Sequence, residues 1–103
     1  MIKVSVMYPN SEDAKFDIDY YCNTHIPMAS GLLGDAVKGG SIDSGIAGGA
    51  PGQAAPFIAI GHLIFESVEA FQTAFGPNAE KIMSDLPNYT NIQPIIQISE
   101  IKA

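Results

Sequence analysis

The chain has 103 residues, of which 47% are hydrophobic and 16% charged, and its formal net charge at neutral pH is −6. A chain of this length builds one domain, and eleven acidic residues against five basic ones exclude nucleic-acid binding, which needs an excess of basic side chains. No apolar run approaches the roughly 20 residues that span a bilayer, and an anionic membrane surface would repel the chain. We therefore expect a single domain over residues 1–103, located in the cytoplasm, without nucleic-acid or membrane partners.

The composition also limits the ligands that the domain can hold. The lack of arginine argues against a dedicated phosphate or carboxylate clamp, because such sites exploit the two-pronged guanidinium group. A single cysteine, Cys22, rules out an internal disulfide and a CxxC site. The composition therefore predicts either a neutral, apolar small-molecule ligand or no ligand at all. The apolar excess predicts either an unusually complete core or one face buried against a partner, and a homodimer is the commoner solution.

The first half of the chain predicts a strand, a helix and a second, weaker strand. The segment from Ile2 to Tyr8 has a period of two, with isoleucine, valine and tyrosine on one side and lysine, serine and methionine on the other, which is typical of a strand. Helical spacing follows over residues 16–33, where Asp17 can cap the N-terminus and Pro27 should kink the helix or end its first part. The next stretch, 35–56, predicts one weak strand and then a mobile, glycine-rich loop.

The second half predicts a strong strand, an interrupted helix and a last strand. Phe57 to Phe65 is apolar on both sides, so both faces of this strand should be covered. Ser67 can cap a helix that Gly76-Pro77 interrupts, and residues 92–101 have the pattern of a final strand. The resulting order of four strands and two helical segments indicates an α+β protein with the ferredoxin-like βαββαβ plan.

Several segments together resemble the EthD family of proteins. Residues 16–28 resemble the family signature F-D-x-x-Y-Y-x-x-x-H-x-P-L/M. Four further segments resemble the family, namely residues 45–52, 59–63, 82–90 and 94–99. The resemblance covers nearly the whole chain. It implies a dimeric α+β barrel, in which two four-stranded antiparallel sheets meet face to face and the helices cover the outer faces.

The resemblance is more specific about the fold than about the reaction. Members of the wider superfamily include cofactor-independent oxygenases of polycyclic aromatics, muconolactone isomerase and haem enzymes, and their pockets often lie between the helices and the sheet of one subunit. EthD-like proteins take their name from an ether-degradation gene cluster, and some fungal relatives look like dehydratases of polyketide anthrones. Because one fold hosts several chemistries, only a site can identify the reaction.

His25 is the residue best suited to chemistry. It lies on the expected buried stripe of the first helix, four residues after Tyr21, and imidazole is the usual general acid or base near neutral pH. His25 also matches the histidine of the family signature, so we expect it to be catalytic, with Tyr21 placing or stabilising an enolate or phenolate beside it. The alternative is a core histidine that bonds a backbone carbonyl freed near Pro27.

Three further residues are candidates for contact with a substrate. His62 lies on the isoleucine side of strand 57–65; it approaches His25 if that side meets the helices, and it joins the dimer interface if it does not. Tyr8 and Tyr89 can line the site, although aromatic rings at the ends of elements more often simply pack. Nothing in the spacing demands a metal ion, and no bound cofactor is required.

The sequence leaves two main functions open. As an enzyme, the protein would be a cofactor-independent oxidoreductase of monooxygenase type, a dehydratase or another lyase, or an isomerase, with His25 moving a proton. As a non-catalytic accessory or binding protein of a degradation pathway, it would hold an apolar or aromatic molecule, with His25 in a structural role. A dimer module without a pocket is a third reading, which applies if the interface uses up the apolar excess.

Overall fold

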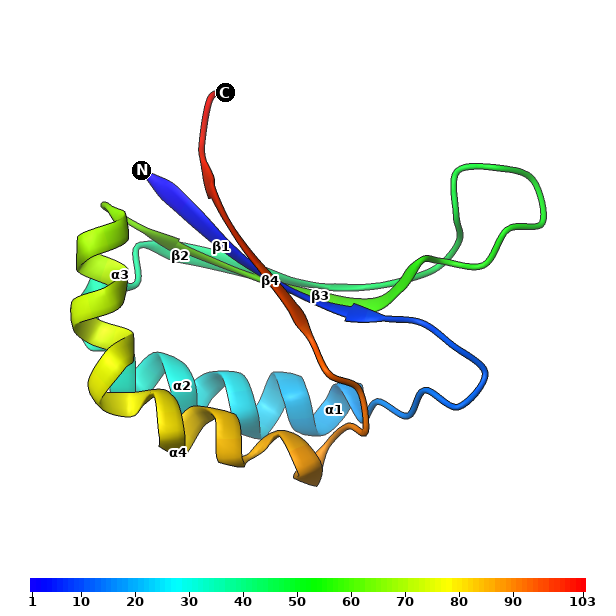
Figure 1. Cartoon of the computed structure of the whole chain (residues 1–103), viewed down its shortest axis with the longest axis horizontal. Coiled ribbons are helices and arrows are strands. Elements are labelled where there is room, and N and C mark those ends of the chain that lie inside the picture. The colour runs from blue at the N-terminus through cyan, green and yellow to red at the C-terminus, as the bar shows by residue number, and fades with distance from the viewer.

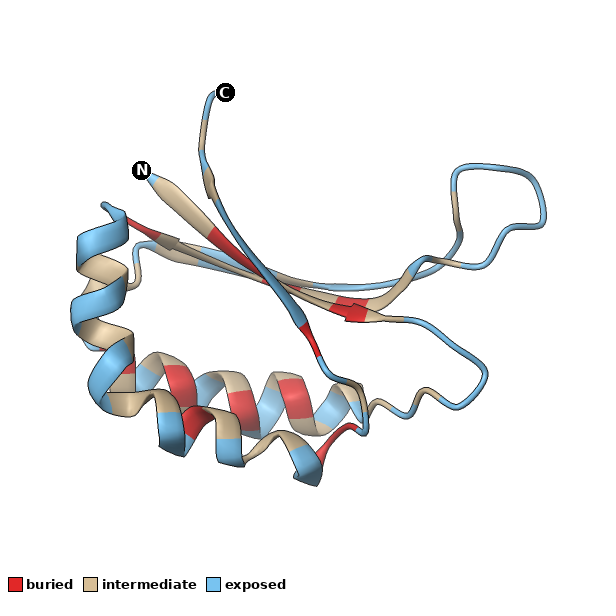
Figure 2. Ribbon diagram, viewed as in Figure 1, coloured by how far each residue is buried: buried red, intermediate tan, exposed pale blue.

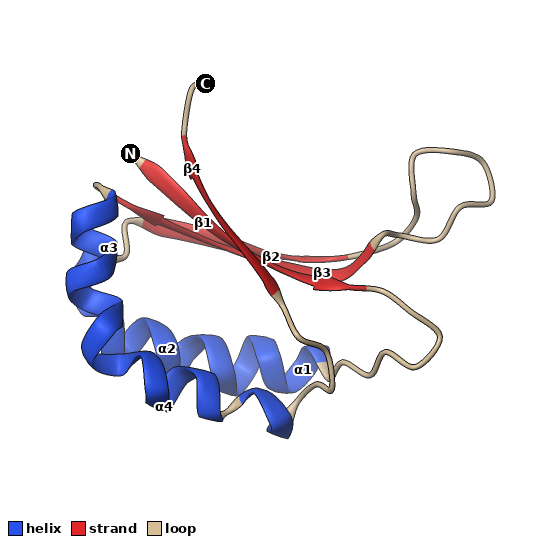
Figure 3. Cartoon of the chain, in the orientation of Figure 1, coloured by secondary structure: helices blue, strands red, loops and turns tan.

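Four antiparallel strands form a single sheet in the order β2-β3-β1-β4 in the computed structural model, which describes residues 1–103 (Figure 1). The strands are β1 (Ile2–Pro9), β2 (Gly39–Ser44), β3 (Phe57–Phe65) and β4 (Ile95–Glu100). Two helical segments connect β1 to β2 and β3 to β4, and both lie on the same face of the sheet (Figure 3). The predicted α+β class and βαββαβ order are therefore confirmed.

The two helical segments form the second layer of the fold. The helices are α1 (Ile18–Tyr20), α2 (Ile26–Leu33), α3 (Val68–Phe75) and α4 (Ala79–Ser84). Asp17 and Ser67 cap the starts of the two segments, as predicted, because their side chains accept hydrogen bonds from backbone amides three residues later. A 3-10 turn at Gly76–Asn78 separates α3 from α4, at the predicted interruption. No helix combines the length and the apolar character that crossing a membrane requires.

A π turn over Tyr21–His25 joins α1 to α2. Pro27 lacks the N–H with which an α-helix bonds the carbonyl four residues earlier, and the amide of Ile26 bonds the carbonyl of Tyr21, five residues earlier. The predicted disturbance at Pro27 therefore takes the form of a wider turn ahead of the proline. Gly34 then ends α2 with a φ of 61°, a value that glycine adopts without strain.

Strand β1 lies between β3 and β4 and pairs with both. The register places Val4 opposite Leu63 on one side and opposite Ile98 on the other. Strand β4 is shorter than the predicted strand over residues 92–101, because Pro94 has no amide hydrogen to contribute to the ladder and pairing begins after it.

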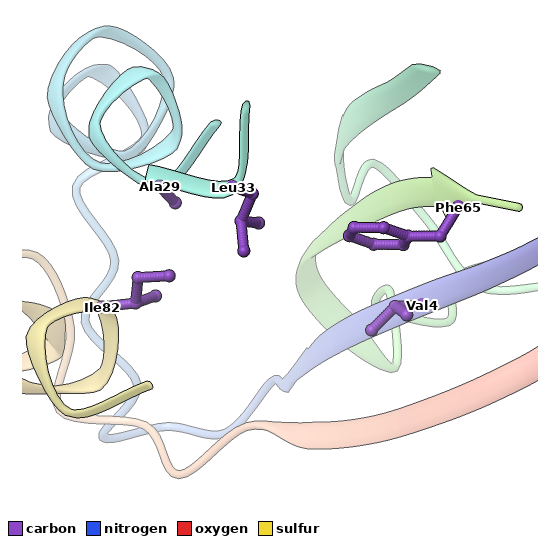
Figure 4. Close-up of a cluster of buried hydrophobic side chains, with 5 residues drawn as sticks. All are labelled: Val4, Ala29, Leu33, Phe65 and Ile82. Carbon is purple, nitrogen blue, oxygen red and sulfur yellow. The ribbon is translucent and has the colours of Figure 1, made fainter. Parts of the chain in front are cut away.

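The main core lies between the helices and the sheet. Figure 4 shows its five buried side chains, Val4, Ala29, Leu33, Phe65 and Ile82. The first and fourth come from the central strands β1 and β3, and the others come from α2 and α4. Fully burying a large apolar side chain contributes roughly 1.5–3 kcal/mol, so this cluster holds the helical layer against the sheet.

The face of the sheet that points away from the helices is uncovered, as Figure 2 shows. Strand alternation places Ile58, Ile60 and Ile64 of β3 on this face, together with Met7 of β1. The prediction that both faces of Phe57–Phe65 are covered therefore holds for only one face within a single chain. No other element of the chain lies over the apolar side chains of the other face.

Candidate functional site

The π turn carries two predicted site residues, Tyr21 and His25, into the space between the helices and the sheet. Tyr21 is 1% exposed and His25 is 4% exposed. Their rings stack with centroids 5.6 Å apart and an interplanar angle of 14°. Single π turns within α-helices occur frequently at functional sites, so this pair is the natural starting point for the chemistry of the site.

A carboxylate, Asp85, holds His25 in place. Asp85 follows α4 directly, and its Oδ2 lies 2.9 Å from Nδ1 of His25. Its Oδ1 accepts hydrogen bonds from the Tyr20 hydroxyl at 2.9 Å and from the Asn88 side-chain amide at 2.8 Å. Burial by itself would raise the pKa of Asp85, but the three hydrogen bonds outweigh burial and lower the pKa below its ordinary value of 3.8. Asp85 is therefore an anion at neutral pH and is fixed at both oxygens.

The carboxylate also decides which nitrogen of His25 is free to react. An anionic Asp85 can only accept a hydrogen bond, so Nδ1 of the neutral ring carries the hydrogen and the lone pair is on Nε2. Every fully buried side-chain nitrogen or oxygen in the chain has a hydrogen-bond partner. Nε2 of His25 makes no hydrogen bond within the chain, so it is not fully buried and can be reached from outside the protein atoms. An imidazole oriented in this way by a carboxylate has the arrangement of a general base.

Two further tyrosines complete an aromatic cluster around His25. The hydroxyls of Tyr8 and Tyr89 lie 2.8 Å apart, and the Tyr89 ring centroid lies 4.6 Å from that of His25. Burial raises the pKa of Tyr8, Tyr21 and Tyr89 above the ordinary value of 10.0. All three are therefore neutral phenols at physiological pH, which suits them to donate hydrogen bonds to a developing negative charge.

Gly61 of β3 makes room for one of these phenols. A Cβ at this position would collide with the hydroxyl of Tyr21. The phenol can therefore rest against bare backbone in the middle of the sheet, where any side chain would displace it.

Two cavities lie between the helices and the sheet. The smaller one, of about 80 Å³, is lined by His25, Tyr8 and Tyr21 and otherwise almost entirely by apolar side chains. The larger one, of about 300 Å³, is lined by residues 39–42 of β2, by His62 of β3 and by Ser30 of α2. Four residues line both cavities, namely Val6, Tyr21, Ile26 and Leu63. The cavities are thus neighbours, and His25 faces only the smaller one. No group of three or more histidine, cysteine or carboxylate side chains is placed to hold a metal ion.

The structure separates the predicted site residues into two places. It brings four of them together, namely His25, Tyr21, Tyr8 and Tyr89. The side chain of His62 lies on the uncovered face of the sheet, where its Nδ1 is 2.9 Å from Oγ of Ser5 and its Nε2 is 3.0 Å from Oδ2 of Asp43. Of the two placements expected for His62, the structure thus shows the one away from His25.

Asp85 is the functional residue that sequence reasoning misses. It lies 60 positions after His25, and its acidic side chain resembles any other solvated one when only the sequence is read. The available signal was its place within residues 82–90, a segment that resembles the EthD family. A buried histidine also needs a hydrogen-bond partner, which is a reason to look for a carboxylate in such a segment.

Comparisons with known proteins place the chain in a family. The sequence pattern that defines the EthD domain matches residues 10–93. The crystal structure of an EthD-like protein from Ralstonia eutropha JMP134 matches with 43% identity and a TM-score of 0.92, over 96% of this chain and 89% of that one. No curated protein matches the sequence.

Two more distant structures share the fold. An ethyl tert-butyl ether (EthD) family protein from Bacillus halodurans C-125 matches over 99% of both chains, with 20% identity and a TM-score of 0.67. A protein from Arabidopsis thaliana matches over 100% of this chain and 97% of that one, with 11% identity and a TM-score of 0.70. With the EthD domain spanning most of its length and a 43% identical EthD-like relative, the chain belongs to the EthD domain family.

Proposed function

We propose that this protein is a homodimeric, cofactor-independent enzyme that binds a neutral, apolar aromatic molecule between its helices and its sheet and moves a proton of that molecule with His25. The observation that carries the proposal is the hydrogen bond between Nδ1 of His25 and Asp85, which leaves a basic Nε2 in contact with accessible space. The carboxylate is itself held by Tyr20 and Asn88, and such a chain of hydrogen bonds supports the proposal because it fixes the orientation of a base.

The proton transfer follows from this geometry. Nε2 of His25 removes a proton from a carbon next to a carbonyl or from a phenol, and the imidazolium that forms is stabilised by the Asp85 carboxylate. The negative charge left on the substrate is an enolate or phenolate, to which Tyr21 can donate a hydrogen bond. Return of the proton to another carbon gives an isomerisation, and its delivery to a departing hydroxyl gives a dehydration. Addition of dioxygen to the carbanion, with the proton returned by the imidazolium, gives a hydroperoxide, and loss of water from it leaves a carbonyl group.

The walls of the cavities indicate the class of molecule. Apolar and aromatic side chains dominate the smaller cavity, and no lysine lines either cavity. A charged ligand would lose its hydration there without gaining a partner of opposite charge, whereas an aromatic ketone or phenol would stack on the tyrosine rings. Such molecules also carry the weakly acidic hydrogens that a histidine base can remove.

The homodimer is the second part of the proposal, and the uncovered sheet face supports it. The apolar side chains of this face, Met7, Ile58, Ile60, Ile64 and Ile95, are left open by the helices. Pairing two such faces would cover them and would produce the barrel that the family resemblance implies.

Deuterium exchange into a ligand tests the proton transfer without knowledge of the complete reaction. Anthrones and aromatic ketones are incubated in D₂O, and NMR follows the loss of the acidic C–H signal with wild type, with His25→Gln and with Glu69→Gln. We expect wild type to accelerate exchange and His25→Gln to lose about 10²-fold or more of that rate, because this is the usual contribution of a positioned base. The Glu69→Gln variant is the control and should retain the rate, since Glu69 is an exposed residue of α3 and lines neither cavity. Exchange that persists in His25→Gln would refute the assignment of His25 as the base.

A non-catalytic binding protein is the second candidate, and one observation favours it. The cavity beside His25 holds only about 80 Å³, whereas the 300 Å³ cavity that could accept an aromatic molecule does not include His25. In this case a ligand would raise the melting temperature of the wild type and of His25→Gln alike. Neither protein would accelerate deuterium exchange, so the same set of variants separates the two functions.

A further inference from the structure

Residues 45–56 connect β2 to β3 as a loop with a defined shape, here called the arm. The backbone amide of Gly48 donates to the carbonyl of Gln53 at 2.8 Å, and the amide of Ala50 donates to the Gln53 side chain at 3.0 Å. Position 48 requires glycine, because a Cβ there would collide with the Gln53 side chain. These contacts within the arm hold its outer part, and Asn10 holds its base by donating hydrogen bonds to the carbonyls of Ala55 and Pro56.

The arm exposes apolar residues and carries no charge. Ile46 is 95% exposed, and most other residues of the arm are exposed alanine, glycine and proline. No aspartate, glutamate, lysine or arginine occurs between Asp43 and Glu66, although the chain as a whole has a net charge of −6. An exposed, ordered, uncharged segment with a large apolar side chain has the character of a contact surface.

The direction of the arm points to the region where a partner would lie. In Figure 1 the arm is the green loop that rises at the right, on the side of the sheet away from the helices. This is the side of the uncovered face, so a molecule that covers this face would also meet the arm.

The charges of the uncovered face favour a second copy of this chain as that molecule. Strand alternation places one cation, Lys3, and one anion, Asp43, on this face, so its formal charge is zero when His62 is neutral. Two copies of a chain with net charge −6 repel each other through acidic surfaces, but not through this face and the uncharged arm. In a two-fold symmetric dimer the same face of both subunits forms the interface. Each subunit then contributes one positive charge, Lys3, and one negative charge, Asp43, so the charges of the two faces balance.

We infer that the arm of each subunit packs against a second copy of this chain and buries Ile46 in the contact. The inference rests on the proposed homodimer and adds a specific element to it. The uncovered sheet faces form most of the dimer interface. Each arm extends this interface beyond the ends of β2 and β3 and contacts the partner subunit there. Because the dimer has two arms, a change at Ile46 acts twice.

Sedimentation equilibrium of Ile46→Asp and Val68→Asp tests the inference. Val68 is an exposed apolar residue on α3, so Val68→Asp adds the same charge to the helical layer, away from the arm and the uncovered face. We expect Ile46→Asp to raise the dissociation constant of the dimer about tenfold or more and Val68→Asp to leave it near that of the wild type. Since both side chains are exposed, circular dichroism should show both variants folded.

Photo-crosslinking provides a second readout. A benzophenone amino acid at position 46 should yield a covalent dimer on irradiation, and the same group at position 68 should not. A dimeric wild type whose dissociation constant is unchanged in Ile46→Asp, with no crosslink from position 46, would overturn the role of the arm and leave the homodimer standing. A wild type that is monomeric at micromolar concentration would overturn both.

Discussion

Nδ1 of His25 lies 2.9 Å from Oδ2 of Asp85, across 60 positions of the sequence. The contact joins the π turn of the first helical segment to the residue that follows α4, so it ties the two helical segments together at the site. It also fixes the hydrogen of the imidazole on Nδ1 and leaves the lone pair on Nε2, the nitrogen to which the proposed function assigns the proton transfer. One contact thus contributes both to the packing of the helical layer and to the proposed chemistry.

Replacing Asp85 with asparagine should remove one part of the acid sensitivity of the fold. The folded pKa of Asp85 is below its ordinary value of 3.8, so the unfolded chain binds this proton more readily than the folded one. The stability that Asp85 contributes is therefore present above about pH 4 and is lost as the pH falls through the lowered folded pKa. We expect the difference in free energy of unfolding between wild type and Asp85→Asn to shrink from neutral pH toward about pH 3. Urea titrations at several pH values measure this difference, and a difference that does not change with pH would contradict the prediction.

Introducing a methyl group at Gly61 should disturb the site through Tyr21. The added Cβ collides with the Tyr21 hydroxyl, so Gly61→Ala should destabilise the fold by about 1–3 kcal/mol and weaken ligand binding. Gly31→Ala is the matched control, because nothing lies within 4 Å of a Cβ there and alanine in a helix should add about 0.5–1 kcal/mol of stability. Thermal unfolding of both variants measures the contrast, and a Gly61→Ala variant as stable as the wild type would contradict the prediction.

The order of elements could be predicted from the sequence because each element carries a local pattern. Phe57 to Phe65 forms β3 with the predicted bounds, since a two-sided apolar run between loop signals has few other solutions. Asp17 and Ser67 cap helices for an equally local reason. The start of the last strand could not be predicted in the same way, because the effect of Pro94 depends on which edge of β4 pairs with β1.

The site could be predicted only in part, because its geometry depends on how distant elements pack. His25 and Tyr21 lie one helical turn apart, so their proximity follows from the chain itself. The contact between His25 and Asp85 forms only because α4 packs beside α2, and no local sequence pattern predicts this packing. Whether His62 points toward the helices depends on which face of the sheet the helices cover. The sequence does not determine this face, because β3 has apolar residues on both sides.

The paired hydroxyls of Tyr8 and Tyr89 should show strong coupling in a double-mutant cycle. They lie 2.8 Å apart in the buried cluster, so removing one leaves the other without its partner. We expect Tyr8→Phe and Tyr89→Phe each to cost about 1–3 kcal/mol of stability, and the double variant to cost clearly less than their sum. Urea unfolding of the four proteins gives the coupling energy. Strict additivity would mean that the two hydroxyls do not depend on each other.

A charge in the centre of the uncovered sheet face should dissociate the proposed homodimer. Ile60 lies on this face in β3, opposite Met7 of β1, so Ile60→Asp places a carboxylate where two faces would meet. Burying an unpaired charge at an interface costs several kcal/mol, so we expect a mass of one chain in light scattering at micromolar concentration, against two chains for the wild type. Val68→Asp is again the matched control and should remain dimeric, because Val68 lies on the helical layer. A dimeric Ile60→Asp with unchanged affinity would show that the subunits meet through a different surface.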